Sequence, residues 1–314
     1  FKTADFTSAA TYNYPFTIPQ GPGGLQPQFN LNYNSQVVDE ATVFTQASWV
    51  GMGWSLELGS ILRNMHETEG DLTDDTFSIS VSGINSLLLP VQIDTPNNTI
   101  SYNSAEQSFA KIIQDTNCNT WEVWTKGGML YQFAFPTQTR NNDGCSTGSE
   151  ENDLTWRWSL SDVTDIHGNQ IHYSYDNEEK DGDSNCNNEV AVYPREIRYS
   201  NDRYRILFER EERGDFLSMW KEPEQKTLFG TKRLKQISVE YQTDGIWENP
   251  PDPIEVIRKY DFHYDPPEGI DNWIYPYLIW NGDGDHTLTL QSVTESNGDD
   301  SLTLPATTFT YAEK

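Results

Sequence analysis

One segment of the sequence matches the spacing of a hydrolase nucleophile. Residues 144–148 read Gly-Cys-Ser-Thr-Gly and place Ser146 at the centre of a G-x-S-x-G pattern. In hydrolases that serine reacts because a sharp turn from a strand into a helix exposes its hydroxyl. Here the segment follows Asn and Asp residues and precedes a Glu pair, with neither a strand nor a helix pattern beside it. The spacing therefore does not predict a hydrolase.

A second segment carries oxygen-bearing side chains at alternate positions, as calcium-binding loops do. It is the stretch 281–285, in which Asp283 and Asp285 are the candidate calcium ligands. The glutamate that completes an EF-hand loop at its twelfth position is missing, because that position holds Ser292. A solvated turn is the interpretation that this composition favours, and calcium is the one cofactor that the sequence leaves open.

The five histidines form no zinc-binding pattern. None belongs to an H-E-x-x-H sequence, since His66-Glu67 has no second histidine. His167 and His172 flank a Gly-Asn turn and would meet only across a hairpin. We favour ordinary strand histidines over zinc ligands. The many Asp and Glu residues nominate no acid–base pair, so we expect a protein without enzymatic activity.

The charge of the chain argues against some classes of partner. The 314 residues include 48 acidic and 21 basic side chains, which gives a formal net charge of −27. Nucleic-acid binding depends on Lys and Arg contacts with phosphates, so we expect no nucleic-acid partner. No apolar run approaches the roughly 20 residues of a membrane-spanning helix. The 10 Trp, 16 Tyr and 14 Phe residues can supply a core, so we expect a soluble globular protein.

Cysteine usage bears on disulfide bonds, and the first residue bears on whether the chain has been processed. Cys118, Cys145 and Cys186 lie in polar segments and are too few for a disulfide framework. One disulfide with one free thiol, or three free thiols, both remain open. The sequence starts at Phe1 with no secretion leader, and we expect a mature or excised piece of a longer protein.

Strands are the secondary structure that we expect to carry these residues, because apolar and polar residues alternate along much of the chain. In 28–34, for example, Phe29, Leu31 and Tyr33 alternate with amide side chains. The same pattern recurs in 171–175, 197–199, 203–208, 237–241, 256–264 and 307–311. Turns rich in Asn, Asp and Gly separate these segments, as in antiparallel hairpins. We expect an all-β fold, a large antiparallel sheet of successive hairpins with few short helices, for example at 105–109 or 216–220.

Two acidic stretches, 140–153 and 176–189, interrupt the strand pattern. Their Asn, Asp, Glu, Ser and Gly content is typical of solvated loops. We place a soft domain boundary near residue 150, which divides the chain into regions 1–150 and 151–314. One continuous domain is the alternative.

Five segments carry a resemblance to a known family. The first two are Gly21–Ser35, which opens Gly-Pro-Gly-Gly-Leu, and Trp49–Leu56, which reads Trp-Val-Gly-Met-Gly-Trp-Ser-Leu. Together they resemble the opening of the SpvB-type plasmid-virulence domain, which is shared by Tc insecticidal toxin B subunits and RHS (YD-repeat) proteins. Three later segments agree with that family in order: 124–133, the hairpin 156–169 that ends in Gly168-Asn169, and 288–311. The resemblance spans nearly the whole chain.

The resemblance implies a sheet of YD-type hairpins that curls into a hollow shell, of which this chain would be a part. In that family the shell encloses a toxic C-terminal polypeptide or serves as an extracellular scaffold. This sequence has no toxin segment and lacks the many further repeats that a closed shell requires.

The signature residues also have a direct physical interpretation. Gly21, Gly23 and Gly24 permit backbone conformations that are closed to other residues and favour a tight entry into the strand at Phe29. Gly51 and Gly53 lie between Trp49 and Trp54, where small residues would let another strand approach closely. An aromatic core cluster is the interpretation we favour for these tryptophans, over a platform that stacks on sugars.

We therefore expect a non-enzymatic β-scaffold that is secreted or lies at the cell surface. Its partners would be further hairpins of the parent chain or neighbouring subunits, because unpaired strand edges invite pairing. A glycan-binding module is the rival prediction. In that case Trp273 and Trp280 would stack on the sugar, and a calcium ion held by acidic loops would assist.

Overall fold

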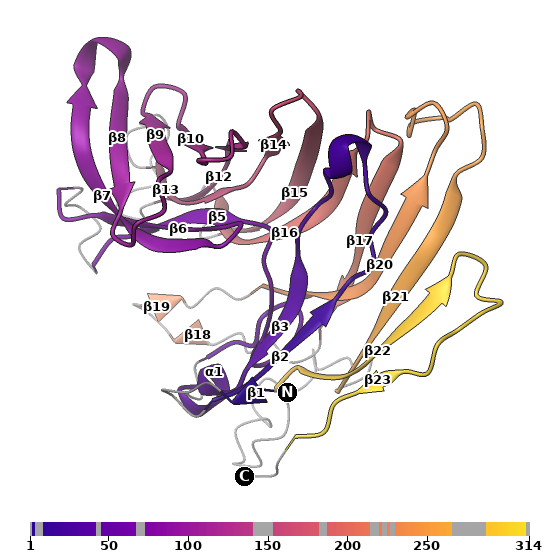
Figure 1. Cartoon of the computed structure of the whole chain (residues 1–314). Coiled ribbons are helices and arrows are strands. Elements are labelled where there is room, and N and C mark those ends of the chain that lie inside the picture. Colours follow the sequence, from indigo (N-terminus) through magenta and orange to yellow (C-terminus); the bar gives the residue numbers. More distant parts are fainter. Residues whose placement is uncertain are drawn as a thin grey trace. The chain divides into compact units, whose positions relative to one another are not determined.

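The computed structural model describes residues 2–3, 9–41, 45–66, 73–140, 153–181, 187–213, 220–221, 225–226, 230–265 and 287–311. Antiparallel strands make up most of these residues, so the predicted all-β fold class is confirmed (Figure 1). No helix among the described residues is long and apolar enough to cross a membrane. The strands group into two compact units, each formed from separate stretches of the chain. The first comprises Phe1–Ile18, Phe29–Glu57 and Asp202–Lys314, and the second comprises Pro19–Gln28 and Leu58–Asn201.

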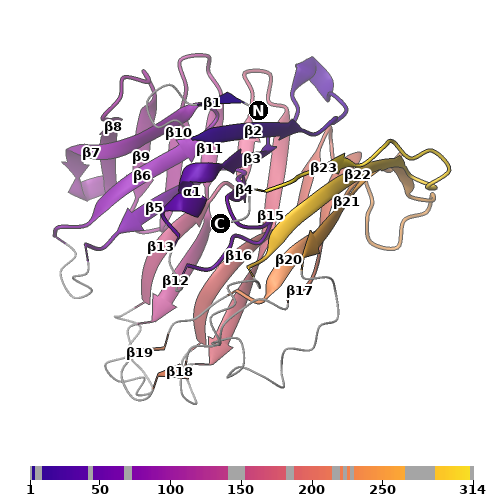
Figure 2. The same cartoon turned by 90° about the horizontal axis from the view of Figure 1, so that it is seen from below.

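The first unit contains two sets of antiparallel strands. One set is β1 (Lys2–Thr3), β2 (Ala10–Pro15), β3 (Asn30–Asn34) and β4 (Trp54–Leu56), in that order. The other is β17 (Tyr204–Glu212), β20 (Lys232–Tyr241), β21 (Glu255–Asp265), β22 (Thr289–Asn297) and β23 (Thr307–Thr308). Figure 2 shows β20, β21 and β22 side by side. The helix α1 (Ser35–Asp39) and the small hairpin of β18 (Trp220–Lys221) and β19 (Gln225–Lys226) complete it.

The second unit is a longer antiparallel series. From β5 (Ser60–Asn64) each strand pairs with the next through β6 (Thr76–Val81), β7 (Ile84–Asp94), β8 (Thr99–Ser104), β9 (Lys111–Asp115), β10 (Thr120–Trp124) and β11 (Leu130–Phe133). Then β11 pairs with β14 (Asp162–Thr164), which leads to β15 (Gln170–Asp181) and β16 (Asn187–Tyr199). The other neighbour of β5 is β13 (Asp153–Ser159), which also pairs with β12 (Phe135–Arg140). Two 3₁₀ turns, η1 (Pro22–Gly24) and η2 (Thr95–Asn97), lie in connections.

The predicted alternation places the aromatic residues inside each unit. On β3, Leu31 is buried while Asn30 and Asn32 are exposed. In the second unit the rings of Phe77, Tyr102, Trp121 and Trp158 lie 4.9–5.9 Å apart between centroids. Burying four such rings removes several hundred square ångströms of surface from water, at roughly 150–250 Å² per ring. These aromatic side chains therefore form much of the core of the second unit.

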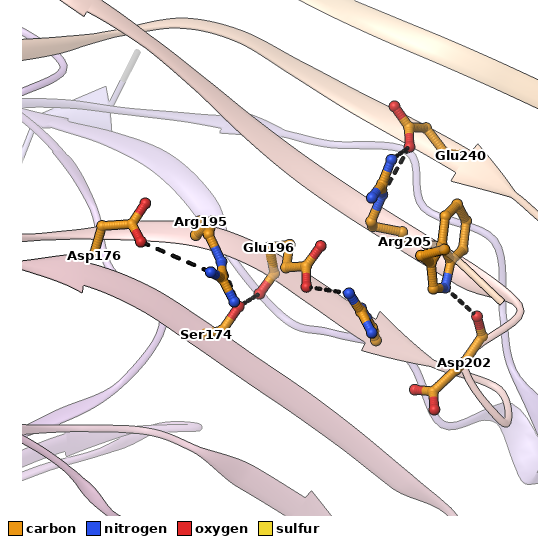
Figure 3. Close-up of polar contacts among 9 residues, drawn as sticks. Ser174, Asp176, Arg195, Glu196, Asp202, Arg205 and Glu240 are labelled. Atoms are coloured by element: carbon orange, nitrogen blue, oxygen red, sulfur yellow. Dashed lines mark hydrogen bonds and ion pairs between the residues drawn. The ribbon is translucent and has the colours of Figure 1, made fainter. Parts of the chain in front are cut away.

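Ion pairs between neighbouring strands fix the register on β17 and β20 of the first unit. Arg205 lies directly opposite Glu240 and donates to one of its carboxylate oxygens from Nε at 2.8 Å and Nη2 at 2.6 Å (Figure 3). Glu211 is opposite Arg233 in the same way, at 2.7 Å. A one-residue slip would move each side chain to the other face of the sheet and break these pairs. The register is thus specified by charge as well as by apolar residues.

The expected helix at 105–109 is absent. Ala105 N donates to Leu87 O, and Glu106 N donates to the Ser86 hydroxyl, so the backbone here is bonded to the neighbouring strand. Phe109 adopts a positive φ of 54°, which ends any helical path. The structure instead has a helix at α1, where the Asn34 side chain accepts from Gln36 N at 3.0 Å and caps the N-terminus. The other candidate, 216–220, lies mostly outside the described residues.

Residue 150 does not separate the two units. The strands on either side of it, β12 and β13, pair with each other in the second unit. The chain instead passes from one unit to the other four times, after Ile18, Gln28, Glu57 and Asn201. The boundary placed at residue 150 by composition marks an acidic connection between paired strands.

Candidate functional site

The first signature segment forms a tight loop in the second unit. Gly21 N donates to Leu25 O at 2.9 Å, and Leu25 N donates to Pro22 O at 3.2 Å, which closes the loop around η1. Gly23 and Gly24 have φ values of 67° and 79°, in the left-handed region that favours glycine. The glycines at these two positions are what allow the loop to close.

The Asp165–Asn169 turn lies between β14 and β15 in the same unit. The Asp165 carboxylate accepts from His167 N at 2.7 Å, Asn169 N at 2.9 Å and Asn169 Nδ2 at 2.7 Å. The hydrogen bond from the Asn169 side chain, with those from the two backbone N–H groups, holds the pKa of Asp165 below its ordinary value. Gly168 has a φ of 81°, which closes the turn. Both residues of the Gly168-Asn169 signature thus build this turn.

These two signature elements contact each other, although about 140 residues separate them in the sequence. A Cβ added to Gly23 would lie 3.3 Å from Asn169 Nδ2 and 3.5 Å from Asp165 Oδ2. The loop therefore fits against the turn only with glycine at this position, or with a small shift of the neighbours. The Asn169 and Asp165 side chains that face Gly23 are hydrogen-bonded to each other.

A pocket of about 200 Å³ lies beside the loop. Gly24, Leu25, Gln26 and Gln28 form one side. The walls are aliphatic and come from several parts of the second unit: Leu58, Val81, Met129, Leu160, Val163 and Ile171. The remaining lining residues are Ser82, Tyr131 and Tyr173. All of them belong to the second unit.

The tyrosines give the pocket a polar side. Tyr131 donates from its hydroxyl to Ser82 Oγ at 2.9 Å. Burial raises the pKa of Tyr173, and the neighbouring Tyr131 phenol raises it further. The Tyr173 hydroxyl is therefore protonated at neutral pH. Within the described part of the chain it has no hydrogen-bond partner.

The second signature segment lies in the first unit and is densely packed. A Cβ on Gly51 would lie 3.1 Å from Leu290 N, and Met52 N donates to Leu288 O at 2.8 Å, so another segment does approach the backbone here. A Cβ on Gly53 would lie 2.7 Å from Tyr33 Cε2.

The tryptophans of this segment are held by the strands around them. Trp54 donates from Nε1 to the Tyr311 hydroxyl at 2.7 Å, and its ring centroid lies 4.5 Å from that of Phe309. Trp49 lies against Phe208 and accepts a backbone hydrogen bond from Leu234. In the described residues this segment belongs to an aromatic core cluster.

A scan against protein families matches residues 4–229 to SpvB, described as Salmonella virulence plasmid 65kDa B protein. The chain belongs to the SpvB family. The matched range contains the signature loop, the Trp49–Trp54 segment and the Asp165–Asn169 turn, so the resemblance inferred from these motifs is confirmed. A search of curated proteins finds no match.

Solved structures share the fold of this SpvB-family chain. A crystal structure of TcdB2-TccC3 matches with a TM-score of 0.62 and 17% identity, covering 95% of this chain and 16% of that one. A Photorhabdus luminescens Tc holotoxin pore matches with a TM-score of 0.58 and 16% identity, and the match covers 96% of this chain and 16% of that one. The N-terminal domain of effector protein SpvB from Salmonella typhimurium strain LT2 matches with a TM-score of 0.59 and 13% identity. That match covers 92% of this chain and 99% of the SpvB domain. The chain thus spans about a sixth of the Tc chains and nearly all of the SpvB domain.

Of the two histidines that flank the Gly168-Asn169 turn, one lies in the turn and one on β15. His172 on β15 lies opposite Asp162 on β14, and its Nδ1 is 2.6 Å from an Asp162 carboxylate oxygen. The cross-strand neighbour of His172 is thus Asp162, and His167 lies in the turn. Among the described residues, no group of three His, Cys, Asp or Glu side chains is arranged to hold a metal ion.

Several candidate residues lie outside the described part of the chain. They are the calcium candidates Asp283 and Asp285, the glycan candidates Trp273 and Trp280, the hydrolase-like Ser146, and Cys145 and Cys186. Cys118 is described as an exposed free thiol. The predictions for calcium and glycans therefore remain predictions from the sequence.

Sequence reasoning did not predict the pocket itself. Gly24, Met129 and Leu160 belong to three segments that carry the family resemblance, and Ile171 and Tyr173 belong to an alternating strand. No motif marks them as the lining of one pocket. Only the pairing of β11 with β14 brings Tyr131 opposite Val163 and so gathers the walls of the pocket.

Proposed function

We propose that this chain is a non-enzymatic β-scaffold module of a secreted, toxin-associated protein. One observation carries the proposal: the residues that define the family signature build backbone and core. Gly23 fits the loop against a turn, Gly51 admits a neighbouring backbone, and Trp54 packs on Phe309. A catalytic signature would be expected to present reactive groups to a substrate. The relatives named as Tc toxin structures support the association with toxins.

The scaffold would act by accepting further β-structure at a strand edge. Among the described strands, β7 pairs with β6 only as far as Leu88, and from Leu89 onward it pairs only with β8. This outer part of β7 carries exposed Leu89, Val91 and Ile93. A strand edge with exposed apolar side chains is a template for pairing with another chain.

Two features would restrict what can dock on this edge. Pro90 has no N–H to offer a neighbouring strand. A register shift between Pro90 and Gln92 also inserts Val91 as a bulge. A bulge bends the strand and interrupts its regular row of hydrogen-bonding groups, so another strand pairs with it less readily. We therefore expect the docking of a particular hairpin of the parent chain or a neighbouring subunit, with Ile93 as an apolar anchor, in preference to indiscriminate strand addition.

Hydrogen exchange at increasing protein concentration, with light scattering, tests this function. We expect association that adds amide protection on the outer part of β7. Ile93→Lys should abolish it, because a buried Lys would lose its hydration. Leu302→Lys is the matched control, since Leu302 in the first unit is 73% exposed and Ile93 is 71% exposed. A monomer at all concentrations, or equal effects of both substitutions, would contradict docking at β7.

A further inference from the structure

The pocket beside the signature loop has the size of a one-ring ligand. Its volume is about 200 Å³. An engineered apolar protein cavity of about 150 Å³ binds benzene. A benzene ring with one small substituent therefore fits, whereas a drug-sized molecule needs about 300–1,000 Å³.

The lining selects against charge. Charged residues make up 22% of this chain, yet all 13 residues that line the pocket are neutral and none is a histidine. Leu58, Val81, Leu160, Val163 and Ile171 are each buried. A carboxylate or ammonium group placed against these aliphatic walls would lose hydration and find no residue of opposite charge in the lining. An uncharged ligand is what this lining can accept.

The polar side of the pocket offers hydrogen bonds that the protein does not use itself. The Tyr173 hydroxyl has no partner in the described part of the chain and is a donor at neutral pH. The Ser82 hydroxyl accepts from Tyr131 and keeps its own hydrogen for a ligand. A bound ring with an oxygen substituent could accept from either group.

We propose that this pocket binds an uncharged aromatic ring that carries a hydroxyl group. The ring could come from a free phenolic compound or from a tyrosine side chain of a bound peptide, and the chemistry of the pocket is the same for both. This inference is independent of the scaffold role, because it uses no residue of the β7 edge.

Fluorine NMR of three matched probes tests the proposal on the purified chain. We expect 4-fluorophenol to bind, fluorobenzene to bind more weakly, and 4-fluorobenzoate not to bind. Binding of 4-fluorobenzoate as tightly as 4-fluorophenol would overturn the proposal, and so would no binding of 4-fluorophenol at all. N-acetyl-tyrosinamide separates the two sources: tighter binding than 4-fluorophenol assigns the ring to a peptide, and weaker binding assigns it to a free phenol.

Two substitutions locate the binding. Tyr173→Phe should weaken 4-fluorophenol by about 2- to 12-fold, the value of one net hydrogen bond, and leave fluorobenzene unchanged. Tyr241→Phe, in the first unit, is the matched control and should change neither. Met129→Trp should fill the pocket from its rim and abolish binding of both probes, whereas Leu87→Trp on exposed β7 should not. Unchanged 4-fluorophenol affinity in Tyr173→Phe would overturn the proposal even if Met129→Trp does not fold.

Discussion

Gly53 in the first unit and Gly24 in the second have nearly the same backbone conformation, with φ values of 76° and 79°. Their surroundings differ. A Cβ on Gly53 would collide with Tyr33 and Val38 at 2.7 and 2.8 Å, whereas a Cβ on Gly24 would meet nothing within 4 Å. The first signature segment makes a loop with hydrogen bonds and open space beside it, and the second is enclosed by rings. The family signature thus contains two different segments: a polar loop with open space beside it, and a tightly packed segment that forms part of the core.

The largest effect should come from the packed segment. Trp54 is 3% exposed, and Trp54→Ala would leave a cavity beside Phe309 and remove the hydrogen bond to Tyr311. We expect a loss of about 3–5 kcal/mol in the free energy of unfolding, measured with urea. Trp124→Ala is the control, because Trp124 is 39% exposed, and it should cost less than about 1 kcal/mol. Equal losses in the two variants would contradict the packing described for Trp54.

The two glycines provide a sharper comparison. Both Gly53→Ala and Gly24→Ala should incur about 1–2 kcal/mol for a left-handed alanine. Gly53→Ala should also overpack Tyr33 and Val38, which brings its total to about 2–5 kcal/mol. Thermal and urea unfolding of the pair measures the difference directly. Should the two variants be equally stable, backbone strain alone would account for both, and the contrast in packing would be wrong.

The smallest effect should be the pH dependence of the Asp165 turn. Hydrogen bonds lower the pKa of Asp165 in the folded protein, so its contribution to stability is present above the unfolded value of about 3.9. That contribution is lost as pH falls from there through the folded pKa. The stability difference between the wild type and Asp165→Asn should therefore shrink on acidification, as urea midpoints at several pH values would show. A difference that stays constant with pH would argue against a role for the carboxylate charge.

Local patterns were sufficient to predict several of the strands and the family. Alternation in 256–264 predicts β21, and in 28–34 it predicts the buried face of β3. The expected helix at 105–109 failed because serine hydroxyls and the neighbouring β7 satisfy the backbone there, which no local count of apolar residues reveals. The pairing of strands that lie far apart in the sequence could not be predicted from local patterns either. The contact of Ile61 on β5 with Trp158 on β13 joins residues almost a hundred positions apart, and it helps to define the second unit.

The candidate site likewise has a part that local sequence predicts and a part that depends on long-range pairing. Its loop and turn could be predicted, because glycines and Asp-x-x-Gly-Asn reveal their conformations in the sequence. Its pocket could not, because Leu58, Val81 and Tyr173 carry no shared pattern and meet only through strand pairing. Motifs report local conformation, whereas the walls of a pocket depend on topology.

The order in which the stretches of the two units occur along the sequence affects how the protein folds during synthesis. Residues 19–201 contain the whole of the second unit, so it can fold while the ribosome is still producing β17 to β23. Tyr12 contacts Phe309, and Thr17 N donates to the Tyr260 hydroxyl, so β2 and its neighbours must wait for late parts of the chain. At about 5–20 residues per second that wait lasts on the order of tens of seconds. We therefore expect nascent chains halted before Tyr260 to resist protease in the second unit while their first residues are cleaved.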